Sequence, residues 1–370
     1  MDMKNRDWLG ELKVRYTDID EIEGLIELNE WERAFFESLR DIPKTSYMPF
    51  SVTRYFFSLA VDNKCDAIRR QFMPSRAELL TGPYESSDPL MEEKYRVLPR
   101  LIHRYKNRVL ILVTDACAVN CRFCFRRYYK SKAEVGNEEV GERGSIGEDE
   151  LEAIGNYLVL HGEVSEVILS GGDPLVLVDG RLKSILNQIR FAREDVTIRV
   201  ASRVLSVLPQ RITKNLVALL SENRPIWFVS HFNHPAELTE EALSAISLLV
   251  EAGIPVVNQT VLLRGINDDT ETLKHLFRRL VHNGVKPYYL FQGDLASGTS
   301  HFRVDLGKGL ELVRELKRSL SGLEMPDYAL DLPGGGGKVS LLSVPIERRE
   351  DGYLVGDYSG GRHFYPGIDY

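Results

Sequence analysis

The sequence is poor in cysteine. Only four cysteines occur in 370 residues, and one of them, Cys65, stands apart from the others. So few cysteines cannot form the disulfide framework of a small secreted protein. The N-terminal stretch MDMKNRDWLGELK also lacks the apolar core of a signal peptide. We therefore expect a cytoplasmic protein.

Long apolar runs and an excess of positive charge are missing as well. The longest apolar runs, such as residues 109–113, fall far short of the roughly 20 residues that cross a bilayer. The formal net charge of −7 argues against a general nucleic-acid or membrane-surface binder. We expect small polar partners, no nucleic acid and no membrane. The chain is long enough for one large α/β barrel with additions or for two to three average domains.

The texture of the sequence changes near residue 100. Before it, charged and aromatic stretches such as EWERAFFESLR have helical apolar spacing. From residue 109, short β-branched runs alternate with longer amphipathic segments. The predicted strands are VLILVT, EVILS, VTIRVAS, IWFVSH, IPVVNQTVLL and KPYYLFQ. The predicted helices lie near residues 148–162, 180–193, 209–222, 236–252, 268–283 and 307–321.

Repeated strand–helix units favour a parallel sheet, so we predict a partial or open (β/α)6 barrel. Each predicted strand ends in polar or glycine residues. In parallel α/β folds, ligands bind at the carboxyl ends of the strands. The segments SGGDP, SHFNHP and FQGDL and the cysteine-containing loop should therefore face one mouth.

Three cysteines form one motif. Cys117, Cys121 and Cys124 have C-x3-C-x2-C spacing directly after a predicted strand, which lets three thiolates converge on one metal centre. A closed zinc site needs four ligands, and a histidine elsewhere in the chain is a possible fourth. An iron–sulfur cluster held by three thiolates instead leaves one iron open to a small molecule. The motif is similar to that of the radical S-adenosylmethionine (SAM) enzymes, which implies a [4Fe–4S] cluster, SAM and a 5′-deoxyadenosyl radical.

A second motif, DLPGGGGKVS, places four glycines before Lys338. It does not match a phosphate-binding P-loop, because Val339 occupies the position of the required Ser or Thr. A flexible turn with a surface lysine is one interpretation. The other is a lysine that binds the aldehyde of pyridoxal 5′-phosphate (PLP), which requires a site that lowers the pKa of the amine.

Taken together, several stretches between residues 100 and 345 resemble the lysine 2,3-aminomutase family. They are HRYKNRV, CAVNCRFCFRR, SGGDPL, SHFNHP, NQTVLLRGIND, PYYLFQGDL, SHFRV and DLPGGGGK. The resemblance implies an isomerase, dependent on radical SAM chemistry and PLP, that moves the α-amino group of L-lysine to the β-carbon to give β-lysine. From the sequence pattern together with this resemblance, we divide the chain into a helical N-terminal region (1–100), a radical SAM partial barrel (101–305) and a C-terminal segment carrying the PLP lysine (306–370).

The resemblance also implies a role for each matching residue. Cluster ligands are Cys117, Cys121 and Cys124, and the PLP lysine is Lys338. Contacts to the PLP phosphate are assigned to Arg104, Tyr105 and Arg108. Arg126 matches the position that binds the substrate α-carboxylate, and Asp294 and Asp331 match the pair that holds a distant ammonium group. Contacts near SAM are assigned to Ser170, Gly171, Gly172, Asp173, His231, Asn258 and Gln259. For the last three, a buried side chain satisfied by the backbone is the alternative.

Two departures from the family pattern stand out. Phe291 occupies a position where the family has a tyrosine that contacts PLP, and the chain lacks the C-terminal cysteines that bind zinc at a subunit interface in longer members. We expect a homo-oligomer whose contacts differ, and a reductant such as flavodoxin or ferredoxin. The alternatives are an arginine 2,3-aminomutase, a PLP enzyme without radicals, and a non-catalytic zinc-stabilised binding protein. Whether β-lysine would serve metabolism or elongation-factor modification stays open.

Overall fold

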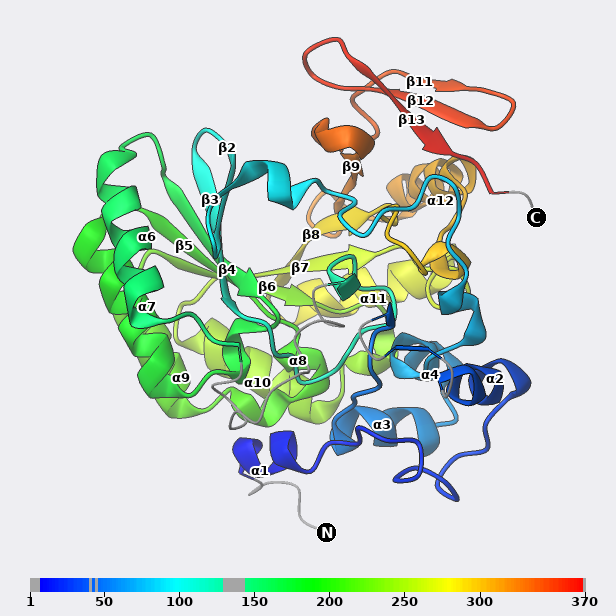
Figure 1. Ribbon diagram of the computed structural model, residues 1–370, viewed down its shortest axis with the longest axis horizontal. Coiled ribbons are helices and arrows are strands. Elements are labelled where there is room, and N and C mark those ends of the chain that lie inside the picture. The colour runs from blue at the N-terminus through cyan, green and yellow to red at the C-terminus, as the bar shows by residue number, and fades with distance from the viewer. Residues whose placement is uncertain (1–6, 40–41, 44–45, 129–143, 369–370) are drawn as a thin grey trace.

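The computed structural model describes residues 7–39, 42–43, 46–128 and 144–368. The N-terminal region is helical, as predicted, and its helices lie together at the end of the molecule near the N-terminus (Figure 1). Its longer helices are α1 (Trp8–Lys13), α2 (Glu30–Ser38), α3 (Arg54–Val61) and α4 (Asp66–Phe72). Two short 3-10 helices follow, η4 (Arg76–Leu79) and η5 (Glu92–Tyr95).

A ten-stranded sheet forms the centre of the described structure, with its strands in sequence order. The strands are β1 (Arg96–Leu98), β2 (Leu101–Tyr105), β3 (Arg108–Thr114), β4 (Glu166–Gly171), β5 (Thr197–Ala201), β6 (Ile226–His231), β7 (Val256–Val261), β8 (Val285–Phe291), β9 (Asp327–Leu332) and β10 (Gly337–Ser340). Neighbours from β3 to β9 pair in parallel, whereas β1, β2 and β10 add antiparallel edges. The six predicted strands are confirmed as β3 to β8, and the sheet forms a partial barrel.

Amphipathic helices cover the outside of the sheet, as the βα pattern predicts (Figure 1). They are α6 (Glu148–Leu160), α7 (Asp179–Ala192), α9 (Lys214–Glu222), α10 (Glu240–Glu251), α11 (Thr270–His282) and α12 (Leu306–Ser319), with the one-turn helix α8 (Val204–Val207) between β5 and α9. Local polar residues fix where several of them begin. The side chains of Thr213, Thr239 and Asp269 accept hydrogen bonds from backbone N–H groups in the first turns of α9, α10 and α11.

The C-terminal segment continues the sheet before it leaves it. Strand β9 adds in parallel to β8, and β10 folds back antiparallel onto β9. A separate three-stranded antiparallel sheet follows, formed by β11 (Ile346–Arg348), β12 (Gly352–Gly356) and β13 (Arg362–Pro366). Figure 1 shows it in red beyond β9. One buried apolar cluster includes Leu12, Ile111 and Tyr365, so all three predicted regions contribute to one core, and their division at residues 100 and 305 stays a prediction.

No helix in the described ranges is long and apolar enough to cross a membrane.

Candidate active site

A cavity of about 400 Å³ lies at the carboxyl ends of the parallel strands. It is the place where parallel α/β folds bind ligands, because polar loops from several strands meet there. Nearly all predicted site residues line this cavity, although they come from positions 104 to 338. They are Arg104, Tyr105, Arg108, Cys117, Cys121, Cys124, Arg126, Ser170, Gly171, Gly172, Asp173, His231, Gln259, Asp294, Asp331 and Lys338.

The cysteine loop follows β3 and is fixed by the SGGDP segment at the end of β4. Gly172 N–H donates to Thr114 O at 2.5 Å, and Asp173 N–H donates to Ala116 O at 2.8 Å. A Cβ atom on Gly172 would lie 1.9 Å from Ala116 O, so only glycine allows this approach. Gly171 and Gly172 also line the cavity, so their contact with SAM stays a prediction.

The three thiols of this loop form no disulfide, are partly exposed, and line the cavity. In the described part of the chain, no three His, Cys, Asp or Glu side chains are close enough to hold a single metal ion. A cuboidal cluster does not require such convergence, because each of its irons takes one thiolate. The thiols therefore fit an iron–sulfur cluster with one open iron, and a closed zinc site has no ligand set among the described residues.

The predicted residues near SAM differ in what their side chains do. The Asp173 carboxylate accepts hydrogen bonds from Leu175 N at 3.0 Å, Ser202 Oγ at 2.7 Å and Arg203 N at 2.7 Å, and thereby ties the end of β4 to the loop after β5. Gln259 lines the cavity. Asn258 is not among the residues that line it, in agreement with the alternative given for this residue, a buried amide satisfied within the fold. Its amide is fully buried and is used within the fold, accepting from Phe232 N and donating to Phe232 O.

His231 lines the cavity as an uncharged ring. Burial, together with the nearby positive charge of Arg203, lowers the pKa of His231 to about 3. Its Nε2 lies 3.1 Å from Asn233 Oδ1, which also accepts a hydrogen bond from Val261 N. Because Oδ1 is an acceptor, Nε2 carries the proton, and the opposite ring nitrogen is left as an acceptor.

Lys338 and Asp331 face each other across the β9–β10 hairpin, where they form a register pair. Lys338 Nζ donates to Asp331 Oδ2 at 2.5 Å and lies 3.9 Å from the ring centre of Phe291 and 5.2 Å from that of Tyr289. A primary ammonium group is thus held by a carboxylate against two aromatic rings. Phe291, where we expected a tyrosine, contributes an apolar face to this ammonium.

The glycine loop between β9 and β10 is pressed against the C-terminal sheet. A Cβ atom on Gly336 would lie 2.3 Å from the imidazole of His363 on β13, so a larger residue cannot fit. His363 also lies 3.0 Å from Pro333 O and from Asp357. Gly336 is therefore favoured here by its packing against His363.

Asp294 lies in the same cavity as a second carboxyl group. Burial, followed by the nearby charge of Asp331, raises the pKa of Asp294 to about 7, although the charge of Lys338 opposes the shift. Two carboxyl groups that share one cation cannot both ionise freely, which is the cause of such a shift. Near neutral pH, part of the Asp294 population is therefore uncharged. A further cation in the cavity would favour its ionised form.

An arginine-rich wall lies next to Lys338. The backbone N–H of Lys338 donates to Tyr105 Oη at 2.9 Å, and the guanidinium of Arg108 stacks 4.0 Å from the Tyr105 ring centre. Arg104 Nη1 donates to Leu90 O, but its Nη2 is buried without an acceptor among the described residues. Buried donors normally have a partner, so this wall fits an anionic group such as the phosphate of PLP.

Arg126 lines the cavity with a partner that sequence reasoning missed. Glu92, in η5, accepts from Arg126 Nη2 at 2.6 Å and from Nε at 2.9 Å, and Ser170 Oγ lies 3.1 Å from Nη1. This bidentate pair fixes the guanidinium plane. Glu92 is buried, but it lies in a segment rich in acidic residues. No local feature of the sequence therefore distinguishes its role from that of Glu93.

Comparison with known proteins agrees with this arrangement. Residues 111–277 match the family model of the radical SAM superfamily. The chain is 37% identical to the L-lysine 2,3-aminomutase of Fusobacterium nucleatum (91% of this chain, 76% of the relative) and 36% identical to that of Bacillus subtilis (98% and 74%). It is also 33% identical to the glutamate 2,3-aminomutase of Clostridioides difficile (96% and 80%).

The fold and the superfamily match define a radical SAM enzyme, which uses a [4Fe–4S] cluster and SAM. More particularly, the chain belongs to the lysine 2,3-aminomutase family and is an isomerase that acts on an amino acid. The predicted family is confirmed. The non-catalytic zinc-binding alternative is therefore not retained.

Proposed function

We propose that this enzyme moves the α-amino group of L-lysine to the β-carbon and that PLP binds at Lys338. The observation that carries the proposal is the ammonium group of Lys338, held 2.5 Å from Asp331 in a cavity that also contains Asp294. If Lys338 binds PLP, its positive charge leaves this pair of carboxyl groups. A substrate with a side-chain ammonium then restores the charge balance that a buried site needs.

The bound cofactors supply the difficult chemistry, namely a carbon radical generated from SAM and an electron sink provided by PLP. The chain's own residues position the reactants. Arg126, fixed by Glu92, suits the substrate carboxylate, and Asp294 and Asp331 suit the far ammonium group. Arg104 and Arg108 suit the phosphate of PLP. The rings of Tyr289 and Phe291 line the cavity and lie beside the amine of Lys338.

Charge separates lysine from glutamate as a substrate. A glutamate side chain would bring a third carboxylate to Asp294 and Asp331, and like charges in one buried site repel each other. Arginine is the close alternative, since a guanidinium group also suits two carboxylates. The test is anaerobic turnover with SAM, PLP and reductant against L-lysine, L-arginine and L-glutamate. We expect β-lysine as the main product, and turnover of arginine but not lysine would reverse the assignment.

The raised pKa of Asp294 predicts how lysine use depends on pH. The carboxylate form of Asp294 attracts the substrate ammonium group. With a pKa of about 7, this form is the major one only above about pH 7. We expect kcat/KM for lysine to rise about tenfold over the two pH units centred on this pKa, since the charged fraction rises from about one tenth to about nine tenths. PLP bound at Lys338 removes one cation, so the transition in the loaded enzyme lies at or above pH 7.

The matched variant for this pH profile is Asp294→Asn, which keeps the shape of the side chain but cannot ionise. We expect it to raise KM for lysine and to flatten the rise, while the absorbance of both cofactors is retained. An unchanged profile in Asp294→Asn would assign the transition to another group and remove Asp294 from the substrate site.

Other parts of the prediction depend on the family alone. A one-electron donor such as flavodoxin or ferredoxin would reduce the cluster, and the enzyme would act as a homo-oligomer in the cytoplasm. Anaerobic purification followed by measurement of mass in solution tests the oligomeric state.

A further inference from the structure

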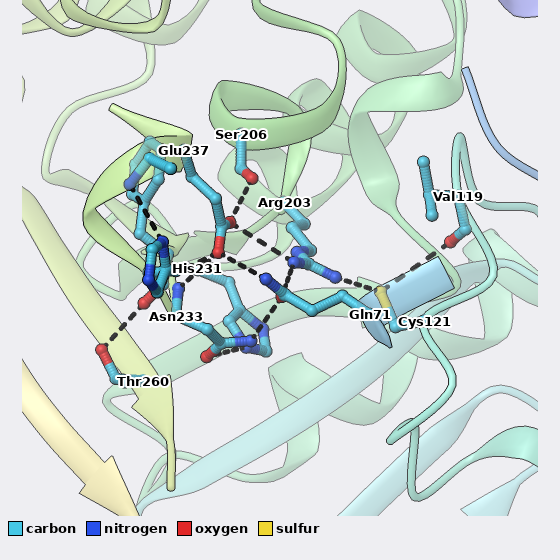
Figure 2. Close-up of polar contacts among 12 residues, drawn as sticks. Gln71, Val119, Cys121, Arg203, Ser206, His231, Asn233, Glu237 and Thr260 are labelled. Atoms are coloured by element: carbon cyan, nitrogen blue, oxygen red, sulfur yellow. Dashed lines mark hydrogen bonds and ion pairs between the residues drawn. The ribbon is translucent and has the colours of Figure 1, made fainter. Parts of the chain in front are cut away.

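A buried polar network lies behind the cysteine loop, and none of the predicted roles accounts for it. Its centre is Arg203, which follows β5 and is only 7% exposed. Figure 2 shows the Arg203 guanidinium between Cys121 on one side and Glu237 on the other. Its Nη1 donates to Cys121 Sγ at 2.6 Å. Its Nη2 donates to Gln71 Oε1 and lies 3.3 Å from Glu237 Oε2.

The partners of Arg203 are themselves fixed. Both oxygens of Glu237 are used: Oε1 accepts from Gln71 Nε2 at 3.0 Å and from Asn233 N at 3.0 Å, and Oε2 accepts from Ser206 Oγ. Glu237 and Gln71 are fully buried. Gln71 belongs to α4, so the N-terminal helical region takes part in holding the guanidinium against a cysteine of the barrel. Because both terminal nitrogens of the guanidinium are held, this network leaves it little freedom to rotate.

The guanidinium is charged despite its burial. Arginine stays charged in proteins, and this guanidinium lies between the Cys121 sulfur and the Glu237 carboxylate. A fixed positive charge that donates to a cluster sulfur stabilises the more negative, reduced form of an iron–sulfur cluster. Partners of this kind, one shell behind the metal ligands, adjust the properties of the metal centre.

We propose that Arg203 is a positioning residue that raises the reduction potential of the cluster held by Cys117, Cys121 and Cys124, and that Gln71 and Glu237 keep it in place. This inference rests on those three cysteines being the cluster ligands. The step concerned is the transfer of one electron from an external low-potential donor to the oxidised cluster. Arg203 neither gains nor loses an electron or a proton, and it only stabilises the added charge.

The test is an anaerobic redox titration of the reconstituted enzyme, followed by electron paramagnetic resonance in the absence of SAM. The variant is Arg203→Met with Glu237→Gln, which removes both charges and leaves no unpaired carboxylate. We expect the ratio of reduced to oxidised cluster at the wild-type midpoint to fall about tenfold, which corresponds to about 59 mV for a one-electron couple. Arg203→Lys keeps the charge and should restore part of the loss, and Gln71→Met should give a smaller shift in the same direction.

The matched control is a second buried arginine pair that is bound elsewhere. Arg211 donates to Leu175 O and Leu177 O and pairs with Asp179 at 2.7 Å. Arg211→Met with Asp179→Asn should leave the midpoint unchanged.

Three results would overturn the proposal. An unchanged midpoint in the double variant, with full iron and sulfide content, removes Arg203 as a determinant of the potential. The Nε of Arg203 has no acceptor among the described residues, so a change in SAM affinity alone would assign the residue to the SAM carboxylate instead. Loss of iron in both the double variant and Arg203→Lys would show that the residue only supports the cysteine loop. A wild-type protein without iron and sulfide would instead reject the cluster site itself.

Discussion

Replacement of Lys338 by alanine is expected to abolish the absorbance of lysine-bound PLP and leave the iron–sulfur spectrum intact, whereas Cys121→Ala is expected to do the reverse. The reason is that the two proposed anchors lie on different elements around one cavity. Lys338 is on β10, held by Tyr105 and Asp331, and Cys121 is on the loop after β3. Turnover should fall in each variant by more than the roughly 10²- to 10⁴-fold that a positioned acid or base contributes, because a whole cofactor is no longer anchored.

Absorbance spectra and iron and sulfide content, measured anaerobically, check this result. Lys308→Ala is the matched control, because Lys308 pairs with Asp268 outside the cavity and its side chain is 41% exposed. It should retain both cofactors and full turnover. Loss of both cofactors together in Lys338→Ala or in Cys121→Ala would indicate misfolding and would argue against separate anchors.

The second large effect concerns Glu78, which holds the base of the cysteine loop. Its buried carboxylate accepts from Arg122 Nη2 and Arg127 Nη2, each at 2.5 Å. Burial would raise the pKa of Glu78, but the charges of Arg122 and Arg127 lower it overall, so the group is ionised. Glu78→Gln leaves two buried guanidinium groups without a counter-charge, which is expected to cost about 3 to 5 kcal/mol of stability.

Urea-induced unfolding followed by circular dichroism measures this loss. Because Arg122 directly follows Cys121, we also expect Glu78→Gln to bind less iron. Glu93→Gln is the control, since Glu93 pairs with Arg96 at 2.8 Å and its side chain is 56% exposed. Exposed ion pairs contribute about 0 to 1 kcal/mol, so the control should unfold near the wild-type urea concentration. Equal effects of the two substitutions would contradict a special role for the buried cluster.

Much of the fold was predictable from local patterns. The periods of apolar residues gave β3 to β8 and the helices around them, because each element buries one face against the same sheet. The strand β9 was not predicted, although DYALDL is apolar at alternate positions. The segment was interpreted only as part of the glycine-rich loop that directly follows it. The antiparallel edge strands were missed because they are short and carry several charged residues.

The residues of the site also fall into those that the sequence identified and those that it did not. Motif spacing identified residues that face the cavity, such as Cys121 and Lys338, because their chemistry requires particular side chains in a particular order. It did not identify Glu92, Glu78 or Gln71, because these act through partners 34 or more residues away in sequence. Arg203 was within reach of sequence reasoning, since it directly follows a predicted strand end, where the other ligand-binding loops were sought.

The pairing of Lys338 with Asp331 has a consequence for how the enzyme becomes loaded. In the absence of PLP, the amine of Lys338 occupies the Asp331 carboxylate. The side-chain ammonium of a free lysine must therefore compete with it. The tethered amine has the higher effective concentration and is expected to win. If PLP binds at Lys338 as we propose, it removes that amine from Asp331 and frees the carboxylate for a substrate ammonium group. We would then expect PLP to bind before the amino acid.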